Sequence, residues 1–291
     1  MTSPSGDVPG SPAPGVTVVV MSRDRRTDLL ATLPRHEAPV VLVDNASADG
    51  TVAAVRAARP EVTVLPMPRN VGSYARTVGV EHAGTEFVAF ADDDSWWAPG
   101  DLARAADLMR AHPRLAVLNA RILVGPEERV DPVCAEMARS PLSGSDLPGP
   151  ALLGFVACGA MVRTEAFLAA GGFDPVVRFP GEEERLSLDL AAAGWGLAYV
   201  ESVTVHHHPS TRRHAPEQRR TAIWRSRFLT ALMRRTLPEV GRVIVQAIRT
   251  GGPERRGLLR ALPDVPAALR RRRPVPPAVR EQLRVLAESA A

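Results

Sequence analysis

Three adjacent aspartates, Asp92, Asp93 and Asp94, come directly after a mainly apolar run over residues 86–91. That run has the composition of a buried strand, so the aspartates stand where the strand ends. Paired carboxylates in such a place suit a hard divalent cation, because Mg²⁺ commonly takes one or two carboxylates together with substrate phosphates. A solvated acidic turn that caps the next helix is the alternative. The strand and the two tryptophans that follow favour the metal site.

Three histidines, His206–His208, end another predicted strand in the same way. Neighbouring side chains of a strand point to opposite faces, so His206 and His208 share one face and His207 takes the other. A histidine at a strand end can bind a metal or contact a phosphate, and it can equally be a structural residue. The residues alone leave open which of the three acts.

Glu182, Glu183 and Glu184 follow Gly181 and open a predicted helix. The helix dipole stabilises acidic side chains in a first turn, which is a purely structural role. A glutamate beside a bound substrate can also act as a general base and take a proton from a hydroxyl, and one of the three suffices for this. Asp189, further along the same helix, is expected to be a surface charge.

Asn70 and Gly72 lie at the start of a further predicted helix, where free N–H groups can bind an anion. Arg69 or Arg76 could add positive charge there. Because all 36 basic residues of the chain are arginines, a plain surface role is the alternative for either of them.

Strands alternate with helices over short loops in the first part of the chain, which predicts an α/β fold with a mostly parallel sheet flanked by helices. In such sheets ligands bind at the carboxyl ends of the strands, so Asp44 and the three aspartates stand at the binding edge. Residues 125–150, rich in proline, glycine and serine, are predicted to form a mobile loop. The predicted strands include residues 16–22, 39–45, 62–67, 86–91, 115–124 and 197–209.

Composition argues against several other classes of protein. A formal net charge of +4 is too small to indicate a nucleic-acid-binding protein, and no apolar run reaches the roughly 18 residues of a membrane span. Residues 1–14 have the composition of a disordered tail, not of a signal peptide. Cys134 and Cys158 lack metal-binding spacing, so two reduced, partly buried thiols are expected. A cytoplasmic enzyme or binding protein fits these features.

The chain carries, in this order, the motifs VTVVVMSRDR, VLVDNASADGT, RNVG, FVAFADDDSWW, GGFDP, GEEE with DLAAAGW, and HHHP. The ordered set resembles that of the inverting glycosyltransferases of family 2, which have the Rossmann-like GT-A fold. The resemblance covers residues 15–210 and leaves an arginine-rich helical extension over residues 211–291. It implies an enzyme that takes a sugar from a nucleotide-diphosphate donor and transfers it to an acceptor hydroxyl.

For the donor, the resemblance implies a site at the carboxyl edge of the sheet. Asp44 would line the nucleoside pocket together with the loop that begins at Ser22, and Asp49 belongs to the same motif as Asp44. Arg76 matches an arginine common after the N-x-G motif, whereas Thr77 stands where an asparagine is common. The residues expected at the nucleotide sugar are Ser22, Arg23, Asp44, Asn45, Asn70, Arg76, Asp92 and Asp93.

For the chemistry, the resemblance implies a divalent metal and a catalytic base. Asp92 and Asp94 match the two ends of the D-x-D motif, with Asp92 near the ribose and Asp94 as the direct ligand of Mg²⁺ or Mn²⁺. His207 matches the family's C-terminal histidine and joins the expected metal ligands. Counting back from the AGW motif places Glu182 and Glu183 on the family's acidic pair. Glu183 is the expected base, although aspartate is commoner at this position.

The end of the chain, from Arg249 to Ala291, contains ten arginines and four acidic residues, a net charge of +6. With its apolar residues it could lie on an anionic membrane surface, which would suit a lipid-linked acceptor and a location at the inner face of the membrane. A solubilising helical appendage is the alternative. A small-molecule or glycan hydroxyl is the other kind of acceptor left open.

Two other functions compete with sugar transfer. A nucleotidyltransferase also uses a metal and acidic residues, but it normally has a glycine-rich phosphate loop after the first strand, and SRDRRTD has none. A catalytically inactive scaffold that binds nucleotide sugars is the alternative without enzymatic activity. The retained ADDD and GEEE motifs argue against it.

Overall fold

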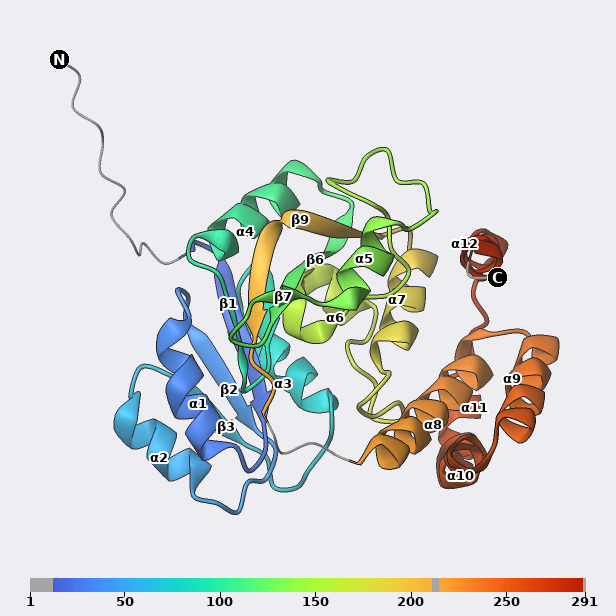
Figure 1. The fold of residues 1–291 in the computed structure, drawn as a ribbon, viewed down its shortest axis with the longest axis horizontal. Coiled ribbons are helices and arrows are strands. Elements are labelled where there is room, and N and C mark those ends of the chain that lie inside the picture. The colour runs from blue at the N-terminus through green and yellow to red at the C-terminus, as the bar shows by residue number, and fades with distance from the viewer. Residues whose placement is uncertain (1–12, 211–214, 290–291) are drawn as a thin grey trace.

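The computed structural model describes residues 13–210 and 215–289 (Figure 1). Almost all of the tail predicted over residues 1–14 lies outside the described residues. Within the described part, one sheet forms the centre, helices cover both of its faces, and further helices follow at the C-terminal end.

The sheet has the strand order β3-β2-β1-β4-β8-β6-β9-β5, and β7 pairs with β6. Its first half is parallel, as the sequence predicted, whereas β8 runs antiparallel to both β4 and β6, so that the sheet as a whole is mixed. The strands are β1 (Val16–Ser22), β2 (Val40–Asp44), β3 (Thr63–Pro66), β4 (Phe87–Ala91), β5 (Ser95–Trp97), β6 (Leu115–Val124), β7 (Arg129–Val130), β8 (Ala160–Arg163) and β9 (Gly196–His207).

Alternate side chains of the strands enter two cores on opposite faces of the sheet. Val18 and Val20 of β1 pack in one core with side chains of α1, α2 and α4, and Val19 packs in the other with side chains of α3, α6 and α7. Helix α3 packs closely against the sheet at Gly79, where a side chain would not fit because its Cβ would lie 2.5 Å from Val19 Cγ1. The helices of this part are α1 (Arg26–Thr32), α2 (Thr51–Ala58), α3 (Tyr74–Ala83), α4 (Asp101–Ala111), α5 (Pro132–Ala138), α6 (Thr164–Ala169) and α7 (Glu183–Ala192), with 3-10 turns η1 (Leu33–Arg35) and η2 (Ala157–Gly159).

The segment predicted to be a mobile loop, residues 125–150, contains regular structure, so that prediction was wrong in part. Strand β7 pairs with the end of β6, and α5 begins where the carboxylate of Asp131 accepts the N–H of Val133 at 2.9 Å. Cys134 on α5 and Cys158 are both buried free thiols, which confirms the prediction for the cysteines.

The C-terminal helices pack on the body of the protein. Val240, Ala261 and Ala268 share an apolar cluster with Val176 and Val177 of the segment before α7. The arginine-rich end is therefore more than a solubilising appendage, while the domain boundary at residue 210 stays a prediction. The helices are α8 (Pro216–Arg234), α9 (Leu237–Thr250), α10 (Gly252–Ala261), α11 (Val265–Arg270) and α12 (Pro277–Ser289), with η3 (Leu262–Asp264) before α11. Among the described helices, none has the length and apolar composition to cross a membrane.

Candidate active site

The pairing of β5 with β9 brings the aspartates and the histidines together. The turn with Asp92–Asp94 joins β4 to β5, and Ser95 of β5 pairs with His207 while Trp96 pairs with His206. The end of β9 is thereby held beside the turn, and the backbone N–H of His208 donates to the carbonyl oxygen of Asp94 at 2.8 Å. The two sequence motifs form one site through this antiparallel pair.

Asp92, Asp94 and His207 each offer a ligand atom, and these atoms lie within 4.8 Å of one another. His207 Nε2 is 3.3 Å from Asp94 Oδ1, and all three residues are partly exposed at the edge of the sheet. Two carboxylates and an imidazole suit Mg²⁺ or Mn²⁺, because these ions prefer oxygen ligands and Mn²⁺ also accepts nitrogen. The donor set therefore fits the metal that the sequence predicts.

Asp93 points to the other side of the turn. Its Oδ2 accepts the hydroxyl of Ser22 at 2.9 Å, and its carbonyl oxygen accepts the hydroxyl of Thr32 at 2.9 Å. Burial and then repulsion from Asp94 and Asp92 raise the pKa of Asp93 to about 7. Asp93 and Ser22, both expected at the nucleotide sugar, thus bind each other and fix the aspartate turn to the end of β1.

The guanidinium of Arg76, on α3, is buried between two acidic groups. Its Nη2 lies 2.5 Å from Asp92 Oδ1, and its Nη1 lies 3.3 Å from Glu182 Oε1. Burial disfavours the charge, but the carboxylates of Asp92, Glu182 and Glu183 outweigh it and raise the pKa of Arg76. The surface role left open for Arg76 is excluded, whereas Arg69 is exposed.

The three glutamates at the start of α7 have different surroundings. Glu182 is fully buried against Arg76, and burial followed by repulsion from Glu183 raises the pKa of Glu182 to about 8. Glu184 pairs with Arg235 at 2.9 Å. Burial also raises the pKa of Glu183, against the opposing effects of nearby backbone N–H groups and Arg76. Among the described residues, Glu183 is the one of the three that forms no ion pair with an arginine side chain.

Asp44 is buried at the end of β2 and retains an acceptor for a ligand. Its Oδ2 accepts the N–H of Ser47 at 3.0 Å, and its Oδ1 has no partner among the described residues. An unpaired buried acceptor is unfavourable in the free protein, and a ligand N–H or O–H can satisfy it. This arrangement suits the nucleoside-binding role expected for Asp44.

Other residues expected at the nucleotide sugar hold the surrounding loops. Asn45 accepts the N–H of Val71 at 2.8 Å and donates to the carbonyl of Gly72 at 3.0 Å, which ties the RNVG loop to the end of β2. Asn70 accepts the N–H of Gly72 at 2.8 Å, where the φ of +64° favours glycine. Arg23 is exposed and lies 3.5 Å from Asp24.

Asp49 and Thr77 also have structural partners. Asp49 accepts the backbone N–H of Thr51 at 3.0 Å, at the start of α2. Thr77, which stands where an asparagine is common in the family, accepts the N–H of Phe173 at 2.8 Å. Both side chains thus stabilise the loops around the site.

The two tryptophans after the aspartates present no open ring face for a sugar. Trp97 is 2% exposed and donates from Nε1 to the carbonyl of Phe90 at 3.1 Å. Trp96 is 8% exposed and lies against the guanidinium of Arg35 and the ring of His206. Core packing is therefore the role of both. The aromatic ring exposed near the glutamates is Phe179, at 42%, which sequence reasoning missed although it stands in the FPGEEE run.

The prediction that Asp189 is a surface charge was wrong. It accepts from Arg185 one turn earlier, and both of its oxygens accept from the buried Arg234 of α8. The carboxylate predicted to be a surface charge therefore attaches α7, the helix of the three glutamates, to the C-terminal helices.

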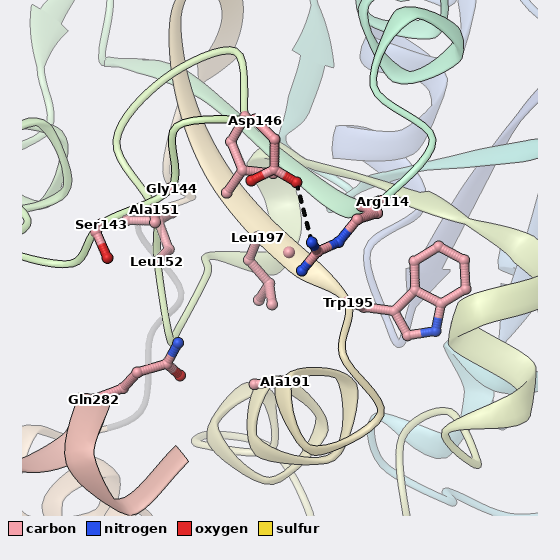
Figure 2. Close-up of a pocket in the computed structure, with 12 residues that line it drawn as sticks. Arg114, Ser143, Gly144, Asp146, Ala151, Leu152, Ala191, Trp195, Leu197 and Gln282 are labelled. Atoms are coloured by element: carbon pink, nitrogen blue, oxygen red, sulfur yellow. Dashed lines mark ion pairs between the residues drawn. The ribbon is translucent and has the colours of Figure 1, made fainter. Parts of the chain in front are cut away.

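A small cavity lies at the opposite end of β9 from the aspartates (Figure 2). It has a volume of about 90 Å³, and Gly196 and Leu197 at the start of β9 line it together with Arg114 and Asp146, which form an ion pair. A volume this small does not hold a nucleotide sugar, since ligand pockets commonly measure ~300–1,000 Å³. This cavity is therefore not the donor site, and the candidate site is the edge where Asp92, Asp94 and His207 gather.

Comparison with known proteins connects this geometry to a family. The sequence profile of Glycosyl transferase family 2 matches residues 24–169, half of the chain. The chain is also similar, at 30% identity, to N-acetylglucosaminyl-diphospho-decaprenol L-rhamnosyltransferase of Mycobacterium tuberculosis; the match covers 58% of this chain and 66% of that protein, slightly less than two thirds of its length.

Solved glycosyltransferase structures share the fold. S. aureus TarS 1–349 in complex with UDP-GlcNAc has a TM-score of 0.57 at 17% identity, over 87% of this chain and 81% of that chain. The mannosyltransferase PcManGT from Pyrobaculum calidifontis, in complex with GDP-Man and Mn²⁺, has a TM-score of 0.51 at 19% identity, over 99% of this chain and 79% of that chain. With its GT-A fold and its matched sequence, the chain belongs to glycosyl transferase family 2.

Proposed function

We propose that the protein transfers a sugar from a nucleotide-diphosphate donor to an acceptor hydroxyl and inverts the anomeric carbon. The observation that carries this proposal is the position of Arg76 between Asp92 and Glu182. One buried guanidinium contacts both the acidic group that fits a metal and the acidic pair that contains the expected base. A donor with its diphosphate at the first group would thus present its sugar near the second.

The nucleoside of the donor would occupy the edge near Asp44, whose Oδ1 has no partner among the described residues and would accept a hydrogen bond from it. The solved relatives support a nucleotide sugar as donor, since TarS was solved with UDP-GlcNAc and PcManGT with GDP-Man. These two donors differ in both nucleotide and sugar. The proposal therefore names nucleotide-diphosphate sugars as the class of donor and does not choose one nucleotide or one sugar.

Asp94, Asp92 and His207 would hold a divalent metal, Mg²⁺ or Mn²⁺. When bound, such an ion offsets the negative charge that develops on the leaving diphosphate. Asp94 is fixed for this role by its neighbours, because the N–H groups of His208 and Ser210 donate to its carbonyl oxygen and to its Oδ2 at 2.8 and 3.0 Å.

Glu183 would take the proton of the acceptor hydroxyl. The hydroxyl oxygen then forms its bond to the anomeric carbon while the bond from that carbon to the diphosphate breaks, and attack from the opposite side inverts the carbon. A raised pKa makes the ionised Glu183 a stronger base, which favours proton transfer from a hydroxyl.

The name of the mycobacterial relative describes a sugar acceptor linked by diphosphate to decaprenol. We therefore propose a lipid-linked sugar as the acceptor, which places the reaction at a membrane surface, with the protein on the cytoplasmic side. A soluble glycan or small-molecule hydroxyl is the competing acceptor.

A donor screen tests the proposed function. Purified protein is incubated with UDP-, dTDP- and GDP-sugars, with Mn²⁺ or with a chelator, and release of the nucleoside diphosphate is measured. The proposal predicts metal-dependent release from at least one donor and a smaller release by the Glu183→Gln variant. Release of pyrophosphate from a nucleoside triphosphate and a sugar 1-phosphate, in a parallel incubation, would indicate a nucleotidyltransferase, and binding without release by any donor would indicate an inactive scaffold.

A further inference from the structure

The outer face of α10 and the segment after it are both apolar and cationic. Leu259, Leu262 and Leu269 are 64%, 57% and 49% exposed. Single exposed leucines are common on soluble proteins, but a group of them in one short segment indicates a contact surface. The segment also presents exposed arginines, and the set named here the α10 face comprises Arg255, Leu259, Arg260, Leu262, Leu269 and Arg270.

The segment of the α10 face supplies no exposed carboxylate of its own among the described residues to balance its positive charge. Between residues 252 and 273 the acidic residues are Glu254 and Asp264. Glu254 is 1% exposed and pairs with Arg220, and Asp264 pairs with Arg225 at 2.5 Å. Among the described residues, Arg260 and Arg270 form no hydrogen bond or ion pair through their side chains.

The opposite side of α10 is fixed against α8, so the α10 face stays outward. Gly257 meets α8 so closely that a Cβ there would lie 2.7 Å from Trp224 Cβ. Ala261, one turn further on, is fully buried in the cluster that contains Leu229 and Met233 of α8. The exposed leucines therefore have no room to turn inward without separating two packed helices.

The segment that carries the α10 face contacts the loop that leads to Glu182 and Glu183. Asp264 lies 3.7 Å from Arg178, whose carbonyl oxygen accepts the hydroxyl of Ser226 at 2.7 Å. Phe179, the exposed aromatic residue, comes next in the chain and is followed by the segment that opens α7. In Figure 1, α10 lies at the lower end of the molecule, toward which β1 and β2 also run. A surface that covers the α10 face thus also lies near the loop that carries Phe179 and leads to Glu183.

We propose that the α10 face binds the surface of an anionic phospholipid bilayer. Leucines of an outward helix face enter the boundary between head groups and acyl chains, while arginines beside them contact lipid phosphates. A bilayer fits better than a protein groove, because the face combines unbalanced positive charge with scattered apolar side chains. A bilayer would carry the lipid-linked acceptor of the proposed function. The proposal rests on that function only for this biological role, because binding to the bilayer itself needs no substrate.

Co-sedimentation with vesicles tests the proposal on the whole protein without donor or acceptor. Vesicles of phosphatidylcholine alone are compared with vesicles that also contain phosphatidylglycerol, at low and high salt. We expect binding to the anionic vesicles at low salt and release at high salt, because salt screens the attraction. The double variant Leu259→Asn with Leu262→Asn should bind at least about tenfold more weakly, since both side chains lose their contact with the acyl chains.

A double variant outside the C-terminal helices is the control. Val130 of β7 and Leu168 of α6 are 52% and 37% exposed, and Val130→Asn with Leu168→Asn should keep the binding of the wild type. Both variants should keep the wild-type rate of donor hydrolysis, which shows that they are folded. Absence of wild-type binding to anionic vesicles, undiminished binding by the α10 variant, or equal loss in the two variants would overturn the proposal. A chain that transfers no sugar would still bind vesicles, so failure of the proposed function is seen separately.

Discussion

Arg76 of α3 and Glu182 at the start of α7 form a buried ion pair at 3.3 Å between parts of the chain that are 106 residues apart. The same guanidinium contacts Asp92 at 2.5 Å. Because neither Arg76 nor Glu182 is more than 1% exposed, this pair fixes the aspartate turn relative to α7. The residues expected to bind the metal and the base are therefore held at one spacing before any substrate enters.

Arg76→Ala should destabilise the protein strongly. The substitution removes the buried guanidinium that contacts both Asp92 and Glu182, and breaking a buried ion pair from one side costs about 3–5 kcal/mol. Urea unfolding followed by circular dichroism measures the change. Arg69→Ala, at an exposed position of the same segment, is the control and should change the free energy of unfolding by less than about 0.5 kcal/mol. Equal stability of the two variants would show that the pair contributes little.

His207→Gln should remove most of the metal dependence of donor binding, and Asp94→Ala should abolish it. Both changes delete a group whose ligand atom lies in the acidic cluster. His206→Gln is the matched control, because His206 faces Trp96 and pairs with Glu128 at 2.8 Å. Calorimetric titration with UDP or dTDP, with and without Mn²⁺, gives the comparison. Metal-dependent affinity that survives in Asp94→Ala contradicts the assignment.

Glu183→Gln should bind donor as the wild type does and lose transfer by ~10²-fold or more, the usual scale for loss of a general base. Glu184→Gln, one residue further on and paired with Arg235, should retain most of the activity. Steady-state kinetics with saturating donor separates turnover from binding. If Glu182→Gln abolishes transfer and Glu183→Gln reduces it only slightly, the base is Glu182 and not Glu183.

The difference in stability between the wild type and the Glu182→Gln variant should change with pH in a defined direction. Burial raises the pKa of Glu182 to about 8 from its ordinary value of 4.5, so the folded protein keeps a proton that the unfolded chain loses in this range. The free energy of unfolding of the wild type therefore falls as pH rises between these values. The variant, which cannot ionise, should match the wild type near the lower value and be the more stable of the two near the upper one. Melting curves at both pH values test this, and a difference that does not widen with pH would be inconsistent with a buried, ionisable Glu182.

The sequence predicted the parallel half of the sheet because its strands are β-branched runs that end at turn residues or acidic side chains. The residue types of the aspartates predicted a metal site, whereas the choice of Asp92, Asp94 and His207 as the individual ligands came from the family resemblance. Their contact depends on β5, a strand of three residues after a polar turn, which is too short for a periodic signal.

Other features were missed because their partners are distant in the chain. Asp189 carries the sequence signature of an exposed helix residue, and its burial follows from Arg234 on α8. The average composition of residues 125–150 indicates a loop, although the Asp131-Pro132 pair within this segment is a helix start signal. Likewise, the abundance of arginine after Arg249 obscured the small apolar residues, such as Ala261 and Val275, that pack against the body.

The stereochemistry of transfer tests the central claim most directly. An α-linked nucleotide sugar that the donor screen identifies is incubated with the wild-type protein, Mn²⁺ and an acceptor, and the anomeric configuration of the product is read by NMR. Attack assisted by Glu183 from the side opposite the diphosphate predicts a β-linked product. An α-linked product would contradict the account, because retention requires a different arrangement of nucleophile and base from the one formed by Asp94, Arg76 and Glu183.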